Sequence, residues 1–177
     1  MKVDILAIGA HPDDVELGCG GTIAKLISEG KKVAIIDLTE GELGTRGTNE
    51  TRAQEAATAS EILGISAREN LKMKDGFIIN SQEYQFRIIE MIRKYQPEIV
   101  LCNAIDDRHP DHAKAAKLVS DACFLSGLVK IKTDYEGESQ KFWRPKQVFH
   151  YIQWKNIEPD FVMDISGFLD KKIEACL

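Results

Sequence analysis

The chain has 177 residues, of which 44% are hydrophobic and 29% charged, and its formal net charge is −5. This length and composition indicate a single globular domain, residues 1–177, with enough apolar residues for a sizeable core. The acidic balance argues against nucleic acid or an anionic membrane surface as the main partner, and no apolar run is long enough to span a bilayer.

Strands and helices are predicted to alternate along the chain. The predicted elements are strand 3–10, helix 20–29, strand 33–38, helix 49–63, strand 70–73, helix 82–95, strand 98–103, helix 111–124, and strands 147–153 and 161–165. A polar loop is expected over 130–144. Near-continuous apolar strands that alternate with helices favour a parallel sheet covered on both faces. We therefore expect a Rossmann-like three-layer α/β/α fold with a mostly parallel sheet.

The C-terminal stretch has helical spacing and a candidate N-cap at Ser166. The pattern stops at Leu177 without a stop signal, so we expect a chain that is truncated there. The four cysteines show no Cys-x-x-Cys spacing and lie in apolar or glycine-rich contexts, as free thiols in a reducing compartment do. Because the sequence enters a strand directly after Met1, with no signal peptide, we expect a cytoplasmic protein.

A first candidate site follows the first predicted strand. His11, Asp13 and Asp14 stand between that strand and the next helix. A residue before proline favours extended geometry, which carries His11 to the strand tip. Ligands bind beyond the carboxyl ends of strands in open α/β sheets. The alternative is that Asp13 or Asp14 only caps the helix.

A second stretch, residues 106–112, repeats the His-Pro-Asp sequence after strand 98–103 and before another helical pattern. It contains His109, Asp111 and His112. If the two strands are neighbours in a parallel sheet, their tips meet. Each stretch alone is a good turn, but two such turns holding three of the four histidines favour a site over a coincidence.

A catalytic zinc ion takes three protein ligands and keeps one position for water. Three side chains of the two stretches can supply these ligands: His11, Asp14 and His112. Asp13 is then free to act as general base, while His109 can protonate a leaving group or stabilise an oxyanion. Asp111 can orient His109. Such a set is suited to metal-assisted amide hydrolysis.

Other classes of function remain open at this point. A metal-dependent phosphoesterase uses similar ligands, and a non-catalytic metal-binding module is also possible. Dinucleotide binding is disfavoured, because the first turn lacks Gly-x-Gly-x-x-Gly and carries carboxylates where a pyrophosphate would lie.

Ala10-His11-Pro12-Asp13-Asp14-x-Glu16, with the later His109-Pro110-Asp111-His112, resembles the PIG-L/LmbE-like zinc deacetylases, which remove acetyl from N-acetylglucosaminyl groups. Gly41 to Thr48, followed by Arg52-Ala53-x-Glu55-Ala56, is similar to the bacillithiol-pathway deacetylases, whose substrate is N-acetylglucosaminyl malate.

The resemblance implies one Zn²⁺ per chain on His11, Asp14 and His112, with Asp13 as base and with help from His109 and Asp111. Iron or cobalt can occupy the same kind of site. It further implies a small-molecule substrate and a homo-oligomer, a hexamer in relatives. Family members usually continue past this C-terminus, with segments that help to close the site. Chito-oligosaccharides and other N-acetylglucosaminides remain alternative substrates.

A malate group brings two carboxylates, which suit bidentate arginine. Arg52, early in helix 49–63, and Arg108, beside the second stretch, are the expected anion-binding residues. Arg46 in the intervening loop and Glu42, as an acceptor for a sugar hydroxyl, are further candidates. The alternative for each of the four is an ordinary surface role.

Overall fold

The computed structural model describes residues 1–177 and is organised around a five-stranded parallel sheet with the strand order β3-β2-β1-β4-β7. Its strands are β1 (Ile5–Gly9), β2 (Val33–Thr39), β3 (Ala67–Met73), β4 (Ile99–Cys102) and β7 (Gln147–His150). The helices are α1 (Asp14–Ser28), α2 (Asn49–Leu63), α3 (Gln82–Tyr95), α4 (Pro110–Ser126) and α5 (Leu169–Cys176). Strands β5 (Asp134–Tyr135) and β6 (Glu138–Ser139) form a separate antiparallel hairpin.

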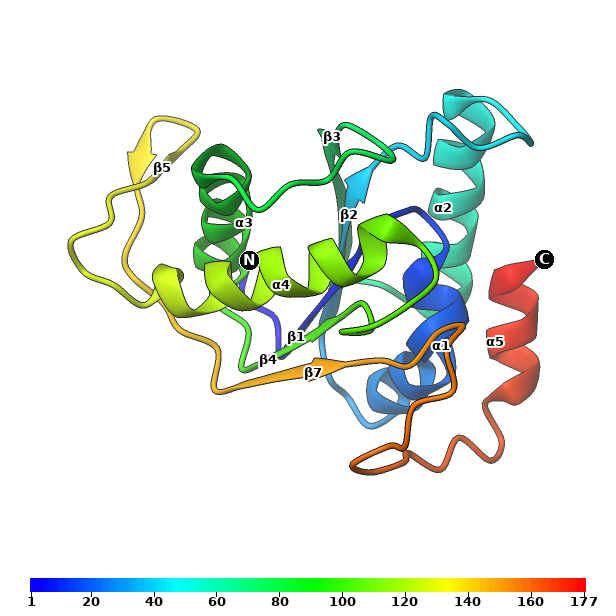
Figure 1. The fold of residues 1–177 in the computed structure, drawn as a ribbon. Helices are drawn as coiled ribbons and strands as arrows, with labels where there is room; N and C mark the ends of the chain where they lie inside the picture. The colour runs from blue at the N-terminus through cyan, green and yellow to red at the C-terminus, as the bar shows by residue number, and fades with distance from the viewer.

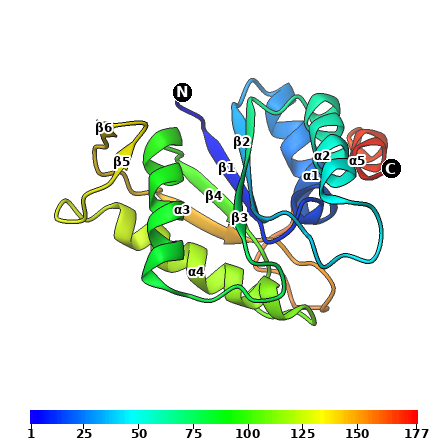
Figure 2. The same ribbon diagram turned by 90° about the horizontal axis from the view of Figure 1, so that it is seen from above.

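Helices cover both faces of the sheet, as Figures 1 and 2 show. Helices α3 and α4 pack together on one face, and α1 and α2 lie on the other with α5 against them. Strand β1 serves both cores: Leu6 and Ile8 belong to the larger hydrophobic cluster with α3 and α4, while Ile5 and Ala7 belong to the cluster with α1. The predicted three-layer α/β/α fold is confirmed.

Helices with clear end signals were predicted best. Helices α2 and α3 have the predicted bounds. Thr48 caps α2 by accepting from the backbone N–H of Thr51, and Gly64 ends it in the left-handed region at φ 82°. Ser81 caps α3 in the same way as Thr48 caps α2.

The first helix begins earlier than predicted, at Asp14 rather than at residue 20, and has a break at Cys19. Its glycines favour a later start because glycine is a poor helix former. Here they serve close packing: a Cβ on Gly18 would lie 2.4 Å from the Tyr151 ring, and one on Gly21 would lie 2.7 Å from Ile165. Tertiary packing therefore outweighs the local preference.

The predicted strand 161–165 is wrong. This segment is irregular and continues into α5. It passes along α1, where Ile165 lies against Gly21 and the backbone carbonyl of Asp164 accepts a hydrogen bond from Lys25 Nζ. Ser166 is not the cap of α5, which starts after Phe168 without a side-chain cap. The predicted loop 130–144 contains the β5–β6 hairpin. Strand β7 ends at His150, three residues earlier than predicted.

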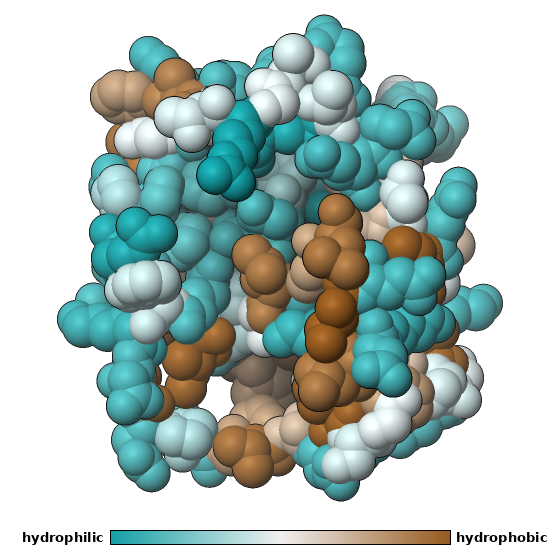
Figure 3. All heavy atoms as spheres, turned by 90° about the vertical axis from the view of Figure 1, so that its right-hand side faces the viewer, coloured by the Kyte–Doolittle hydropathy of each residue, from teal (hydrophilic) through white to brown (hydrophobic).

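Helix α5 buries none of its residues fully. Figure 3 faces the side of the molecule where α5 lies and shows hydrophobic side chains gathered in a column on this face. Leu169 and Ile173 are the exposed large apolar residues of α5, and Leu177, directly after the helix, is exposed as well. None of the helices combines the length and apolar character that a bilayer crossing requires.

Candidate active site

The two His-Pro-Asp turns meet because β1 and β4 are adjacent parallel strands, as the sequence predicts. The chain runs from β1 in one direction through β2 to β3 and returns to place β4 and β7 on the other side. Open α/β sheets bind ligands beyond the carboxyl ends of the strands, at the point where the strand order reverses. A hydrogen bond from the backbone N–H of Ala10 to Asn103 Oδ1 (2.9 Å) joins the two tips directly.

The three predicted metal ligands lie together at this place, with both histidines against the Asp14 carboxylate. Their neighbours form two further sets of potential ligand atoms, His11, His109 and His112, and His11, Asp75 and Asp111. His11 Nδ1 lies 3.4 Å from Asp14 Oδ2, and His112 Nε2 lies 3.1 Å from Asp14 Oδ1. Their side chains are only 12%, 6% and 12% exposed for His11, Asp14 and His112. Two imidazoles and one carboxylate are a donor set typical of catalytic zinc. The residues present therefore fit a divalent ion.

The electrostatics also fit a cation. Burial opposes the charge of Asp14, but hydrogen bonds from His11 and His112 outweigh it and hold the pKa of this carboxyl well below its usual range. Burial would lower the pKa of His11, yet the carboxylates of Asp14, Asp75 and Asp111 raise it to about 9. The pKa of His112 is raised against burial by Asp14. The cluster therefore favours positive charge between these side chains.

Two carboxylates that the sequence did not single out orient the imidazoles. Asp107 Oδ1 lies 3.0 Å from His112 Nδ1, which leaves Nε2 facing Asp14. Asp75 Oδ1 lies 3.0 Å from His11 Nε2, which leaves Nδ1 facing Asp14. Carboxylates in this position fix the ring orientation and tautomer of metal-binding histidines. Asp107 stands beside the second stretch, but Asp75 in Lys74-Asp75-Gly76 resembles a plain turn and gives no such signal.

The predicted contact between the Asp111 carboxylate and His109 is wrong. The Asp111 carboxylate is buried and accepts from the backbone N–H groups of Gly76 (2.7 Å) and Ile78 (3.2 Å), because the loop after β3 comes within reach. It also lies 3.4 Å from His11 Nε2. His109 Nδ1 instead accepts from the backbone N–H of Asp111 at 3.2 Å.

This backbone contact makes His109 Nε2 the protonated nitrogen of the neutral ring. Burial and the neighbouring His11 and His112 lower the pKa of His109. Its ring stacks on that of His112 with centroids 4.8 Å apart. His109 therefore presents a neutral N–H donor to the cavity.

Asp13 does not cap α1 through its side chain, which removes the alternative interpretation of this residue. Its φ of 143° is rare for a residue with a Cβ, and such strain is frequently found at active sites. Desolvation in the cleft and the adjacent Asp14 carboxylate raise the pKa of Asp13 to about 6. Asp13 thus has the properties of a carboxylate that exchanges protons near neutral pH.

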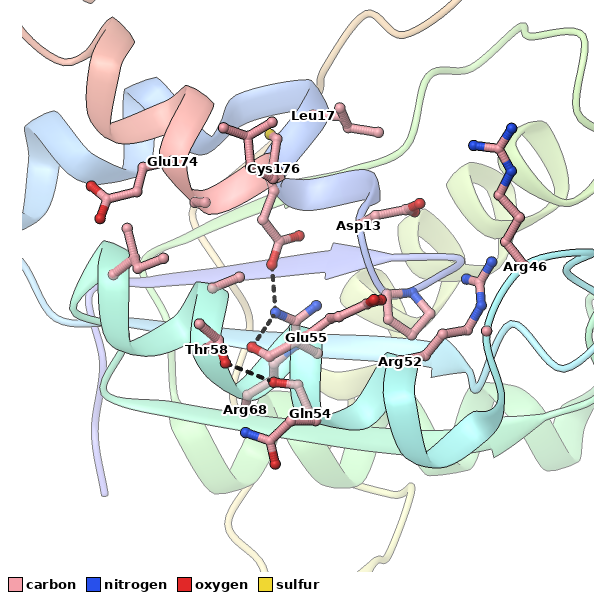
Figure 4. A pocket seen from close by; sticks show the side chains of 18 residues that line it. Asp13, Leu17, Arg46, Arg52, Gln54, Glu55, Thr58, Arg68, Glu174 and Cys176 are labelled. Atoms are coloured by element: carbon pink, nitrogen blue, oxygen red, sulfur yellow. Dashed lines mark hydrogen bonds and ion pairs between the residues drawn. The ribbon is translucent and has the colours of Figure 1, made fainter.

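A cavity of about 580 Å³ is lined by His11, His109 and His112 together with Asp13, Asp14, Arg52 and Arg108. The Arg108 guanidinium lies over the Trp154 ring, 4.6 Å from its centroid. A second cavity of about 480 Å³ adjoins it and shares Asp13, Leu17 and Arg52. Arg46 lines this second cavity; Figure 4 shows Arg46 and Arg52 on the same side as Asp13, with Glu174 and Cys176 of α5 toward the other end.

Glu42 lines neither cavity, and its carboxylate accepts from the backbone N–H of Asp75 (2.8 Å), so it supports the loop that carries Asp75. Glu16 also points away from the histidines. It pairs with Arg68, which binds both Asp37 oxygens at 2.7 and 2.9 Å behind the site. These two glutamates are structural.

Comparisons with known proteins agree with this geometry. Residues 6–123 match the PIG-L family, described as GlcNAc-PI de-N-acetylase. Diacetylchitobiose deacetylase of Thermococcus kodakarensis is 30% identical over 97% of this chain and 67% of its own length. The 4-oxalmesaconate hydratase of Pseudomonas putida is 29% identical over 96% of this chain and 70% of its own. The crystal structure of the conserved protein TT1542 from Thermus thermophilus superposes with a TM-score of 0.92 at 38% identity, covering 98% of this chain and 77% of that one.

Proposed function

The chain belongs to the PIG-L family of GlcNAc-PI de-N-acetylases and is an N-deacetylase of the hydrolase class. We propose on this basis that it removes acetyl from an N-acetylglucosaminyl group with the help of a divalent metal ion. The observation that carries the proposal is the convergence of His11, Asp14 and His112 beside Asp13 and His109. We take the ion to be Zn²⁺, one per chain, with Fe²⁺ or Co²⁺ as alternatives. When bound, it would polarise the acetamide carbonyl and lower the pKa of water.

The remaining chemistry falls to the side chains of the chain. Asp13 accepts the proton of the attacking water, for which its raised pKa is suited. His109 donates its Nε2–H as a hydrogen bond toward the oxygen that becomes negative during attack. The proton that the departing amine needs is the one that Asp13 took from the attacking water. Asp107 and Asp75 keep His112 and His11 in the orientations that face Asp14.

N-acetylglucosaminyl malate is the substrate that we propose within this class. Arg52 and Arg108 line the cavity of the histidines and make no ion pair with a protein carboxylate, so both are free for an anionic group. Arg46 lines the adjoining cavity. A diacetylchitobiose-like substrate is the alternative, because the relative from Thermococcus kodakarensis that is 30% identical over 97% of this chain is a diacetylchitobiose deacetylase by name.

We further propose a cytoplasmic homo-oligomer, a hexamer by the family resemblance. The four cysteines are free thiols, three of them buried, which supports a reducing compartment. Sedimentation of the purified protein tests the oligomeric state.

The decisive experiment measures acetate release from N-acetylglucosaminyl malate, diacetylchitobiose and free N-acetylglucosamine. Each substrate is assayed with the protein as purified, after chelation, and after Zn²⁺ is added back. We expect activity that chelation abolishes and Zn²⁺ restores, with the malate conjugate as the best substrate. Metal-loaded protein that releases no acetate from any of the three would contradict the proposed function, and preference for diacetylchitobiose would contradict the malate assignment alone.

A further inference from the structure

Asp14 accepts more hydrogen bonds than the two histidines account for. Its Oδ2 accepts from the backbone N–H of His11 (3.0 Å) and from Asn103 Nδ2 (3.0 Å), and its Oδ1 accepts from Gln153 Nε2 (2.8 Å). An ionised carboxylate offers about four acceptor positions, two on each oxygen. Three of them are therefore occupied by these fixed donors.

The remaining acceptor position is on Oδ1. This oxygen lies 3.1 Å from His112 Nε2, on the side where the candidate metal ligands converge. Oδ2 holds two fixed donors, and His11 Nδ1 lies farther from it, at 3.4 Å. The fixed donors of Asp14 thus leave one acceptor position, on the oxygen that faces the His112 ring.

The orientations of both amides follow from the network. Gln153 Oε1 accepts from Asn103 Nδ2 (2.9 Å) and from the backbone N–H of Ala104 (3.4 Å), so its Nε2 faces the carboxylate. Asn103 Oδ1 accepts from the backbone N–H of Ala10, so its Nδ2 faces Asp14 and Gln153. A carboxylate only accepts, and flipping either amide would set acceptor against acceptor.

Gln153 is also held rigidly by its neighbours in the chain. The backbone N–H of Tyr151 donates to Cys102 O (2.9 Å), and the Tyr151 hydroxyl donates to Ile8 O (3.0 Å). On the other side, the backbone N–H of Trp154 donates to Asp107 Oδ2 (2.9 Å). The segment after β7 is therefore fixed to the tips of both β1 and β4, and it delivers the Gln153 amide to Asp14.

We propose that Gln153 is a positioning residue for the metal: together with Asn103 it restricts Asp14 to one coordinating oxygen, Oδ1, and fixes the direction of that oxygen. The proposal rests on the proposed function in that Asp14 is taken as a metal ligand. Gln153 acts through Asp14 and does not touch the substrate. Residues that hold a ligand in this way typically contribute about 10–100-fold to metal affinity.

The test compares Gln153→Leu and Gln153→Met, which lack the donor, with Gln147→Leu. Gln147 is an exposed glutamine at the opposite end of β7 and has no side-chain hydrogen bond in the structure. The dissociation constant for Zn²⁺ is measured by competition with a chromophoric chelator, the visible spectrum is recorded with Co²⁺, and thermal unfolding is measured without metal. These readouts do not depend on turnover.

We expect Zn²⁺ affinity to fall about 10–100-fold in both Gln153 variants and the Co²⁺ spectrum to change. Without metal, we expect both Gln153 variants to unfold cooperatively but at a lower temperature than Gln147→Leu, because they lose hydrogen bonds to Asp14 and Asn103. We expect Gln147→Leu to bind metal at the wild-type level. Wild-type affinity and an unchanged Co²⁺ spectrum in folded Gln153→Met would overturn the proposal. Acetate release by the wild type, measured in parallel, reports separately on the proposed function, so loss of metal affinity in the variants without any deacetylation by the wild type would refute that function alone.

Discussion

Removing the Arg52 side chain should separate anion recognition from the acetamide chemistry. The guanidinium lies at the boundary of the two cavities, close against Gly41 and Gly44. A charge-assisted hydrogen bond to a substrate carboxylate contributes about 1.5–3 kcal/mol, which corresponds to roughly one to two decades in kcat/KM. Arg52→Ala should therefore lower kcat/KM for N-acetylglucosaminyl malate by about that factor relative to free N-acetylglucosamine.

The ratio of the two substrates is the informative quantity. Arg52 also lowers the pKa of Asp13, so its loss can alter the turnover of both substrates through the proposed base. Only the part of the loss that is confined to the malate conjugate reports on anion binding. Arg52→Lys should restore part of that loss, because lysine keeps the charge without the planar fork.

A second variant displaces the Arg52 guanidinium without changing Arg52 itself. A Cβ on Gly44 would lie 2.3 Å from Arg52 Nη2, while Gly44 itself has an ordinary φ. Gly44→Ala should displace the guanidinium and reproduce the selective loss. Arg144→Ala, which removes an arginine that lines neither cavity, serves as the control.

Acetate release is measured for both substrates at matched Zn²⁺ content. An equal loss on both substrates, with fold and metal intact, would assign Arg52 to the acetamide chemistry. No loss on either would make it a surface residue and would remove the structural support for malate.

Three further predictions concern other parts of the chain. Asp13→Asn and His109→Ala should each retain Zn²⁺ yet lose about 10²–10⁴-fold in turnover, measured as acetate release and metal content on the same samples; full activity in Asp13→Asn would exclude Asp13 as the base. Arg68→Met should destabilise the fold by about 3–5 kcal/mol because it leaves the buried Asp37 carboxylate without its partner, and urea unfolding with no change in midpoint would refute this. Although burial opposes the charge of Glu69, hydrogen bonds keep its pKa below the ordinary value of 4.5. Ionised Glu69 therefore stabilises the fold above pH 4.5, and this stabilisation is lost as the pH falls through the lowered pKa. Glu69→Gln should make the free energy of unfolding less dependent on pH in the acid range, and an unchanged dependence would contradict this assignment.

The sequence predicted features whose causes are local. Helix α2 has its cap at Thr48 and its stop at Gly64, so both ends were predictable. The start of α1 was not, because Gly18 and Gly21 serve distant partners, Tyr151 and Ile165. The segment 161–165 is apolar, as a strand would be, but it pairs with no strand of the sheet.

The candidate site divides in the same way. An apolar run followed by His-Pro-Asp determines that His11 and His109 stand between a strand end and the next helix, because chain direction and the residue before proline act within a few residues. Only the strand order makes those tips neighbours. Asp75 and Gln153 come from sequence-distant loops and meet His11 and Asp14 only because β3, β1, β4 and β7 end at one edge of the sheet. The sequence by itself therefore determined which side chains are the candidates for the chemistry, whereas the tertiary structure decided which groups hold them, since those contacts span up to 139 positions of the chain.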